Sequence, residues 1–263
     1  MNSSSWIAPL AELFHSFIFL HLDYSGMKDY QKDFLQLCLD YEVLSFGDFK
    51  LKSGRQSPYF FNLGKISDGQ GISRLSECYA AALRDMLPSN TLNAASSTAV
   101  AAAGSVVLFG PAYKGIPLVA STSAVLYSKY GVNLGFAYNR KEAKDHGEGG
   151  QIVGQHSKTA DLFLLDDVVT AGTAIRECIS LIGKQWSEAR VTGVLVALDR
   201  QERLSELDAR STIEAVRQDL GIPIYSIVTF SDLLEFISSL KDHSHLESSL
   251  IAYREKYIAL QQK

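Results

Sequence analysis

The sequence predicts an α/β protein with a mostly parallel sheet flanked by helices, and the arrangement of apolar residues carries this prediction. Short apolar runs with no helical stripe, typical of strands buried on both faces, alternate with amphipathic segments of helical length. The chain has 263 residues, of which 46% are apolar and 21% charged. It is therefore long enough to bury a sizeable core, and its composition is that of an ordinary globular protein.

The first part of the chain is expected to contain a helix, a hairpin and a second helix. Apolar residues recur at helical spacing from Tyr30 to Tyr41, which predicts an amphipathic helix. Phe49 and Leu51 alternate with lysines, and turn residues over 53–58 precede the aromatic run 59–61, which indicates a hairpin. A further stripe predicts a helix over 72–86.

The second part alternates strands with helices, as expected for a parallel sheet covered on both faces. The predicted strands are 106–109, 135–138, 162–165, 191–198 and 222–230. The predicted helices are 118–130, 174–184, 212–220, 232–240 and, roughly, 246–260. Ser231 is the expected N-cap of the helix over 232–240.

Two segments differ in composition from the rest. Residues 1–26 are an N-terminal extension, whose apolar stretch is too short to span a bilayer and lacks the basic start of a secretory signal. Residues 87–105 are rich in Ser, Ala and Asn and uncharged, which indicates a low-complexity insertion. We expect 27–263 to form a single domain, with a small hood subdomain at about 27–65.

Charge and cysteine content exclude some classes of function. A net charge of -4 argues against a general nucleic-acid or membrane-surface binder, because those need a basic face. Cys38, Cys78 and Cys178 are scattered and odd in number, which favours reduced thiols. We therefore expect a cytoplasmic protein with no nucleic-acid or membrane partner.

The segment 161–174 is the strongest signal of chemistry. Asp166 and Asp167 follow the buried strand 162–165, and the small residues 170–173 lead into a helix. Backbone N–H groups there can surround a phosphate, while the carboxylates accept hydrogen bonds from ribose hydroxyls or hold Mg2+ through water. This combination predicts a sugar-phosphate site. The alternative is that the two acids merely cap a helix.

Two more polar loops follow predicted strands. In 110–117, Gly110 and Gly115 allow close approach to a ligand, and Lys114 supplies a charge for phosphate. A proline-bounded turn with a solvated lysine is the alternative there. The stretch 139–150 combines clustered cations with three glycines, as in a mobile lid that closes over a polyanion. Because nearby acids almost balance its charge, an ordinary surface loop is the other interpretation.

Arg200 and the hairpin suggest a site for a flat, acidic compound. A guanidinium after the strand 191–198 can bind a planar carboxylate at two points, although pairing with Asp199 or Glu202 would explain it equally. Phe60 or Phe61 can lie against a heterocycle while Lys52 reaches phosphate. Core packing of these rings is the alternative.

Taken together, these motifs resemble those of the orotate phosphoribosyltransferases, a branch of the type I phosphoribosyltransferase family. The resemblance extends from 27 to about 257 and is carried by 51–54, 57–62, 109–117, 139–150, 165–174 and 197–203. It implies the type I phosphoribosyltransferase fold and Mg2+-dependent transfer of ribose 5-phosphate from phosphoribosyl pyrophosphate (PRPP) to N1 of orotate, giving orotidine 5'-monophosphate and pyrophosphate in pyrimidine synthesis.

The resemblance also assigns residues. The expected catalytic residues are Arg140, Lys144, His146, Asp166 and Asp167. The expected PRPP ligands are Lys52, Tyr113, Lys114, Arg140, Lys141, Lys144, His146, Asp166, Asp167, Val168, Val169, Thr170, Ala171, Gly172, Thr173 and Ala174. The expected orotate ligands are Phe60, Phe61, Thr170 and Arg200. Metal binding is expected mainly through PRPP and water near Asp166 and Asp167, with no certain direct ligand.

The resemblance further implies a homodimer in which the lid acts on the neighbouring subunit's site. It also implies a strained peptide bond between Ala112 and Tyr113, for which the cis geometry is one alternative. An external orotidylate decarboxylase partner is compatible with it. Residues 1–26 and 87–105 are foreign to the family pattern. Two other functions stay open: a type I enzyme with a purine or uracil acceptor, and a PRPP-sensing regulator.

Overall fold

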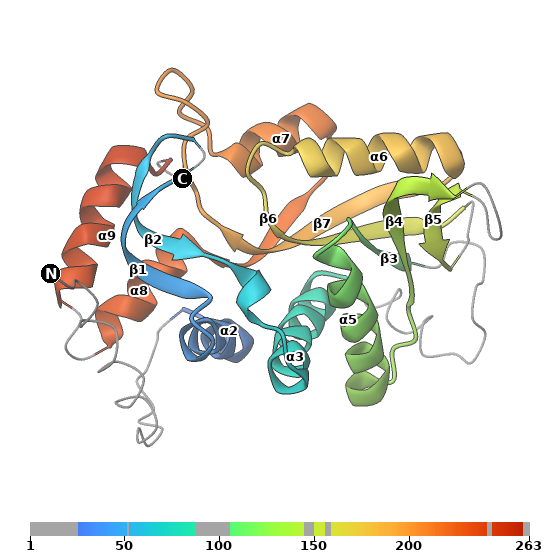
Figure 1. Cartoon of the computed structure of the whole chain (residues 1–263), viewed down its shortest axis with the longest axis horizontal. Coiled ribbons are helices and arrows are strands. Elements are labelled where there is room, and N and C mark those ends of the chain that lie inside the picture. The colour runs from blue at the N-terminus through green and yellow to red at the C-terminus, as the bar shows by residue number, and fades with distance from the viewer. Residues whose placement is uncertain are drawn as a thin grey trace, which may run out of the picture.

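The computed structural model describes residues 26–51, 53–87, 106–144, 150–155, 159–240 and 244–259. Its centre is a six-stranded sheet in the order β5-β4-β3-β6-β7-β8, shown in Figure 1. Neighbouring strands are parallel except for β4 and β5, which pair antiparallel. The strands are β3 (Val106–Gly110), β4 (Gly135–Lys144), β5 (Gly150–Gly154), β6 (Asp161–Val168), β7 (Arg190–Asp199) and β8 (Ile224–Thr229).

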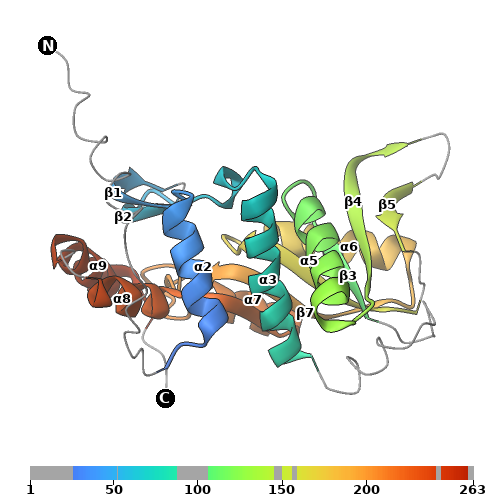
Figure 2. The same cartoon turned by 90° about the horizontal axis from the view of Figure 1, so that it is seen from below.

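Helices cover both faces of this sheet (Figures 1 and 2). On one face lie α2 (Asp29–Asp40), α3 (Gly69–Met86) and α5 (Gly115–Tyr130), and on the other lie α6 (Thr173–Gln185) and α7 (Thr212–Leu220). Alternate side chains of β6 serve the two faces: Phe163 and Leu165 belong to one apolar cluster, and Leu162 and Leu164 to the other. This explains why the strand reads as a continuous apolar run, and it confirms the predicted fold class.

A separate two-stranded antiparallel sheet, β1 (Leu44–Lys50) and β2 (Gln56–Phe61), forms the predicted hairpin. It is followed by the short 3-10 helix η2 (Leu63–Lys65). The last two helices, α8 (Phe230–Ser239) and α9 (Ser244–Tyr257), pack on one another and lie beside the hairpin (Figure 1). The ring of Tyr59 on β2 is fully buried against Phe230 and Tyr253, so the hairpin is anchored to these helices.

Some predicted boundaries are wrong. Asp166 and Asp167 do not lie beyond the strand, because β6 stays in register with β7 as far as Val168. Part of the stretch predicted as a mobile lid is strand, since β4 continues through residues 139–144 and Gly150 already belongs to β5. The sequence did not predict these strand residues, because charged side chains in the second half of β4 hide the alternation of apolar and polar residues, and β5 contains no long apolar run.

The N-cap of α8 is also different from the prediction. Thr229, rather than Ser231, accepts a hydrogen bond from the Asp232 N–H, and the Asp232 carboxylate accepts one from the Thr229 N–H. This capping box begins the helix two residues earlier. Ser231 instead donates to the side-chain oxygen of Gln201.

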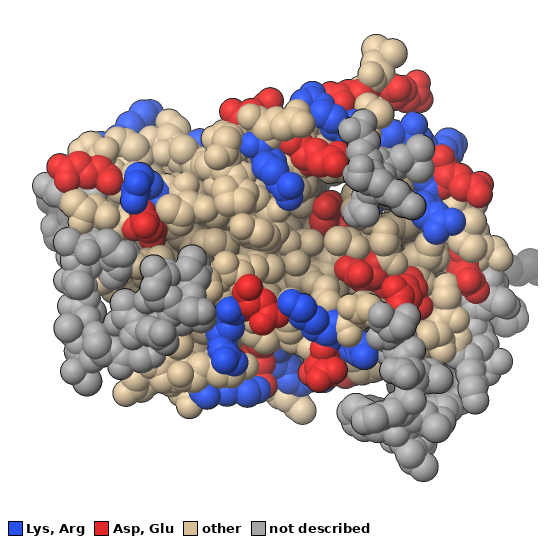
Figure 3. All heavy atoms as spheres, turned by 180° about the vertical axis from the view of Figure 1, so that it is seen from behind, with Lys and Arg blue, Asp and Glu red and all other residues tan. Residues whose placement is uncertain are grey.

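The division into an extension, a single domain with a hood, and an insertion remains a prediction. Except for Gly26 and Leu87, the segments 1–26 and 87–105 lie outside the described residues. Within the described part of the chain, no helix combines the length and the apolar character needed to cross a membrane. On the face shown in Figure 3, basic and acidic side chains are interspersed.

Candidate active site

The loops that follow β3, β6 and β7 meet at one edge of the sheet. These strands are adjacent and parallel, so their carboxyl ends lie side by side. Open α/β sheets bind ligands in the crevice at this edge. The sequence-predicted groups at 110–117, 166–174 and 199–203 are therefore brought to a common region by the topology alone.

The two acids at the end of β6 have different surroundings. Asp167 is buried and its carboxylate accepts from the Val168 N–H and from Nζ of Lys114, at 2.9 and 2.6 Å. Asp166 accepts from the Asp167 N–H at 2.8 Å. Burial, together with the neighbouring Asp167 charge, raises the pKa of Asp166 to about 7. Asp166 is therefore protonated more readily than an ordinary aspartate.

A buried tyrosine from α3 supports this strand end. The Tyr79 hydroxyl donates to the backbone oxygen of Asp166 at 2.8 Å, and its side chain is fully buried. Burial raises the pKa of Tyr79 well above its ordinary value, and the charges of Asp167 and Asp166 raise it further. The phenol therefore stays a neutral donor that fixes the backbone beneath the two carboxylates.

Lys114 joins the loop after β3 to the acids of β6. Its ion pair with Asp167 spans the two adjacent strand ends. The peptide between Ala112 and Tyr113 is cis, as the family resemblance led us to expect. The Ala112 N–H donates to the side-chain oxygen of Asn139 on β4 at 2.9 Å, and Lys141 lies 5.0 Å from the Tyr113 ring centroid. Loop and strand β4 therefore form one polar surface.

The same loop depends on the absence of side chains at its two ends. A Cβ on Gly110 would lie 2.2 Å from the Gly115 carbonyl oxygen, and one on Gly115 would lie 2.7 Å from the carbonyl carbon of Gly110. The end of β3 and the start of α5 are thus in direct backbone contact. That contact shapes the turn that presents Tyr113 and Lys114.

We expect Gly110→Ala to lower the free energy of unfolding by about 1 to 3 kcal/mol, because the added methyl forces backbone apart in a packed region. Urea denaturation measures this. Gly69→Ala is the matched control, since a Cβ there would meet no described heavy atom within 4 Å. Equal stability of Gly110→Ala and Gly69→Ala would show that the loop adapts.

After β6, the chain turns into α6 through exposed small residues. Thr170, Ala171, Thr173 and Ala174 are exposed, and Gly172 is the left-handed N-cap residue of the helix. Glycine has no side chain to accept from the first-turn N–H groups, which suits an anion at this end. A Cβ at Gly172 would also lie 2.7 Å from Val216 on α7.

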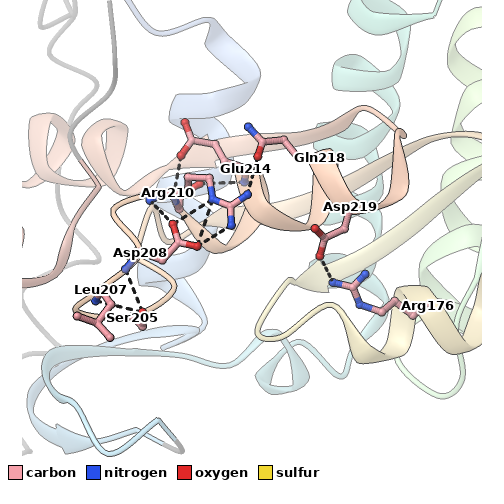
Figure 4. Close-up of polar contacts among 9 residues, drawn as sticks. Arg176, Ser205, Leu207, Asp208, Arg210, Glu214, Gln218 and Asp219 are labelled. Atoms are coloured by element: carbon pink, nitrogen blue, oxygen red, sulfur yellow. Dashed lines mark hydrogen bonds and ion pairs between the residues drawn. The ribbon is translucent and has the colours of Figure 1, made fainter.

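Helix α7 is fixed next to this turn. Arg176 on α6 pairs with Asp219 on α7 at 3.0 Å, as Figure 4 shows. In the loop that leads into α7, the carboxylate of Asp208 accepts from the Arg210 guanidinium, which also donates to Gln218. Val216, on the inner side of α7, is the residue that leaves room only for glycine at 172.

Arg200 lies just after β7 in a buried ionic cluster. Its Nε forms an ion pair with Glu202 at 2.8 Å, and its guanidinium carbon lies 5.0 Å from the Tyr59 ring centroid. Glu202 also accepts from Arg55 of the hairpin turn and from the Tyr253 hydroxyl. Nη2 of Arg200 is buried and has no partner among the described residues. A buried unpaired donor costs about 1 to 3 kcal/mol, so this atom is suited to a ligand acceptor.

Strand β2 of the hairpin directs its two neighbouring phenylalanines to opposite faces. Phe60 is 43% exposed and lies 5.6 Å, centroid to centroid, from Phe49. Phe61, the next residue, packs towards Phe34 of α2 at 6.5 Å. Successive strand residues point to opposite faces, so the two rings do not line the same surface of β2.

The predicted lid is only partly described. Arg140 is half-buried and Lys141 exposed, both within β4. The backbone of Lys144 ends this strand, while its side chain, and residues Lys52 and His146 entirely, lie outside what the structure describes. Val168 ends β6 and Val169 is buried. Among the described residues, no cluster of three or more His, Cys, Asp or Glu could hold a metal ion.

The sequence analysis assigned no role to Tyr79, Arg55 or Tyr253. Each reaches the site from an element distant in sequence, and no local pattern distinguishes such a residue from others of its type. Glu202 was considered only as a partner that would explain Arg200 without a ligand. The pairing does occur, but it leaves Nη2 free among the described residues.

Comparison with known proteins identifies the family. Residues 91–218 match the phosphoribosyl transferase domain family. Orotate phosphoribosyltransferases of Pseudomonas putida and Xanthomonas campestris are 45% and 44% identical to this chain; the alignments cover 88% of it and 99% and 97% of those proteins.

Solved structures point the same way. The orotate phosphoribosyltransferase of Francisella tularensis is 35% identical with a TM-score of 0.69, covering 86% of this chain and 98% of that one. Leishmania donovani UMP synthase, 20% identical with a TM-score of 0.62, shares the fold; the match covers 86% of this chain and 42% of that one. Fold, site and relatives agree, and the chain belongs to the orotate phosphoribosyltransferase family.

Proposed function

We propose that this enzyme catalyses Mg2+-dependent transfer of ribose 5-phosphate from PRPP to N1 of orotate, releasing pyrophosphate and forming orotidine 5'-monophosphate for UMP synthesis. The observation that carries the proposal is the acid pair at the end of β6, with Lys114 bound to Asp167 and the glycine-capped start of α6 directly after it. In this proposal the groups that bind cations, ribose hydroxyls and a phosphate lie close together along residues 166–174.

The 5'-phosphate and ribose of PRPP occupy the segment 166–174. The exposed residues Thr170, Ala171, Thr173 and Ala174 surround the phosphate with backbone N–H groups and hydroxyls,. Asp166 and Asp167 accept hydrogen bonds from the ribose hydroxyls. Val168 and Val169 supply the backbone that joins the two groups.

The pyrophosphate of PRPP is held by cations from two sides. Tyr113 and Lys114 belong to the loop after β3, and Arg140 and Lys141 to β4, with Lys141 already beside the Tyr113 ring. Lys52, Lys144 and His146 complete the set in our proposal. A departing pyrophosphate gains negative charge, and preorganised cations stabilise that charge in the transition state.

The donor chemistry at this edge fits Mg2+. This ion prefers oxygen ligands and usually binds through one or two carboxylates together with substrate phosphates and water. Asp166 and Asp167 offer such oxygens, and PRPP brings the phosphates. When bound, Mg2+ neutralises the pyrophosphate and so makes it a better leaving group.

Orotate lies between the hairpin and the end of β7. The exposed face of Phe60, with Thr170, borders the flat ring, and Arg200 receives the carboxylate through the Nη end of its guanidinium,. Phe61, on the opposite face of β2, supports this strand by packing towards Phe34. As the C1–O bond to pyrophosphate lengthens, N1 approaches C1 from the opposite face. Asp166, Asp167, Arg140, Lys144 and His146 are the proposed catalytic residues; Asp167 and the lid residues are the candidates for taking the N1 proton.

Three further expectations belong to this proposal. The enzyme forms a homodimer whose lid reaches the neighbouring site. It works in the cytoplasm, and orotidylate decarboxylase is a candidate external partner because it consumes the product. Size-exclusion chromatography with light scattering tests the first of these.

Orotate consumption, followed by its ultraviolet absorbance, tests the reaction. We expect turnover only when protein, orotate, PRPP and Mg2+ are all present, because each supplies one part of the chemistry above. Omission of each component in turn is the control. Turnover with uracil or a purine in place of orotate would favour another acceptor, and PRPP binding without any turnover would favour a sensing role.

A further inference from the structure

Glu202 is bound by side chains from three distant parts of the chain. Arg55 of the hairpin turn donates to it from Nη1 at 2.9 Å, and the Tyr253 hydroxyl of α9 donates at 2.8 Å. Nε of Arg200 forms an ion pair with it at 2.8 Å. The Glu202 side chain is only 11% exposed. A carboxylate in this position is rigid, because all its partners are themselves packed.

The cluster has one more positive than negative charge. Two guanidinium groups share a single carboxylate, and the tyrosine hydroxyl contributes a neutral donor. Arg55 has a second partner, since its Nη2 donates to the Arg203 carbonyl at 2.6 Å. The unmatched charge therefore lies on Arg200, where a ligand carboxylate would restore neutrality.

The same contacts decide which edge of Arg200 faces a ligand. Nε is occupied by Glu202 and by the Tyr59 hydroxyl, the latter at 3.2 Å. The Tyr59 ring lies against the guanidinium, with its centroid 5.0 Å from Cζ. One edge and one face of the Arg200 guanidinium are thus in contact with protein groups. The Nη end is left for a ligand, and its Nη2 has no partner within the described chain. Such a fixed fork matches the two oxygens of a planar carboxylate.

We propose that Glu202 is a positioning residue for acceptor specificity: it holds Arg200 so that the Nη end of the guanidinium faces the acceptor's carboxylate. The inference rests on the proposed function, in which Arg200 binds orotate. Because Arg55 sits in the turn before β2, the same carboxylate also ties the strand that carries Phe60 to the end of β7. Glu202 thereby fixes the ring-binding and carboxylate-binding sides of the pocket relative to each other.

Glu202→Gln tests the proposal, because it keeps the size of the side chain and removes its charge. We expect the KM for orotate to rise by about tenfold or more, from loss of a charged hydrogen bond, while the KM for PRPP stays within about twofold. The matched control is Asp161→Asn, which removes a carboxylate bound to Arg190 at the opposite end of β6; both of its KM values should equal those of the unaltered enzyme.

A double-mutant cycle with Arg200→Lys distinguishes the positioning role of Glu202 from the proposed binding of orotate by Arg200. If Glu202 acts through Arg200, the orotate KM of the double variant equals that of Arg200→Lys alone. An orotate KM unchanged by Glu202→Gln but raised by Arg200→Lys would overturn the positioning role and leave the proposed function intact. An orotate KM unchanged by Arg200→Lys would reject both.

The stability of each variant must be measured together with its kinetics. Equal increases in both KM values with a lowered unfolding midpoint would show a general structural role and overturn the proposal. If Glu202→Gln does not fold, Tyr253→Phe replaces it, since this change removes only the hydroxyl that Glu202 accepts from. A selective rise in the orotate KM is then expected, and unchanged kinetics in folded Tyr253→Phe would overturn the inference.

Discussion

Asp167→Asn is expected to lower kcat/KM for orotate and PRPP by about 100- to 1000-fold, the usual cost of removing one preorganised electrostatic group. Asp167 accepts from Lys114 at 2.6 Å and is buried beside the turn into α6. The amide cannot neutralise Lys114 or accept from a ribose hydroxyl as strongly as a carboxylate does. Initial rates with both substrates varied measure the loss.

Asp219→Asn serves as the control for this change. It also removes an acid that pairs with a basic side chain, but the pair with Arg176 lies on the exposed side of α6 and α7. Its rates should match those of the unaltered enzyme. Near-normal turnover in Asp167→Asn would remove this residue from the proposed catalytic set.

Asp166→Asn is expected to make the ligand-free protein more stable at pH 8, by about 1 to 3 kcal/mol in the free energy of unfolding, while it abolishes most turnover. In the folded protein the pKa of Asp166 is about 7, whereas an unfolded aspartate titrates near its ordinary value. From about pH 4 to pH 7 the folded state therefore binds more protons than the unfolded state, and stability falls as the pH rises. Asparagine removes this penalty.

The stability gained by Asp166→Asn should depend on pH. Urea denaturation without PRPP or Mg2+ should show the advantage of Asp166→Asn at pH 8 and a much smaller one at pH 5, where the native carboxyl is already protonated. If the gain in the free energy of unfolding grew on acidification, or were absent at pH 8, the charged form of Asp166 would not be destabilised by its surroundings. Active-site acids of this kind are a known source of lowered stability.

The strands of the main sheet were largely predictable because their burial leaves a clear pattern. The apolar run in β6 reflects a strand with one core on each side, and the acids at its end mark the ligand edge. The strands that were missed or shortened are β5 and the far half of β4, which lie at the sheet edge. There, partial exposure permits polar residues, and the period of two is lost among charges.

Some of the site residues were predictable from the sequence and others were not. Lys114 and Asp167 were assigned from loops that follow strands, and the parallel topology brings them together. Tyr79 and Tyr253 could not be assigned, because their roles rest on one hydroxyl each and on packing between segments far apart in sequence. Local pattern carries no information about such contacts.

The Glu202 cluster also has a consequence for synthesis on the ribosome. Arg55 precedes Glu202 by 147 residues, and Tyr253 follows it by a further 51. At ordinary elongation rates these three side chains emerge over on the order of tens of seconds. All strands of the sheet, including β6 with its two acids, precede α9 in the chain and so emerge before it. The growing polypeptide acquires the parts of its sugar-phosphate site first and closes the cluster around Arg200 last.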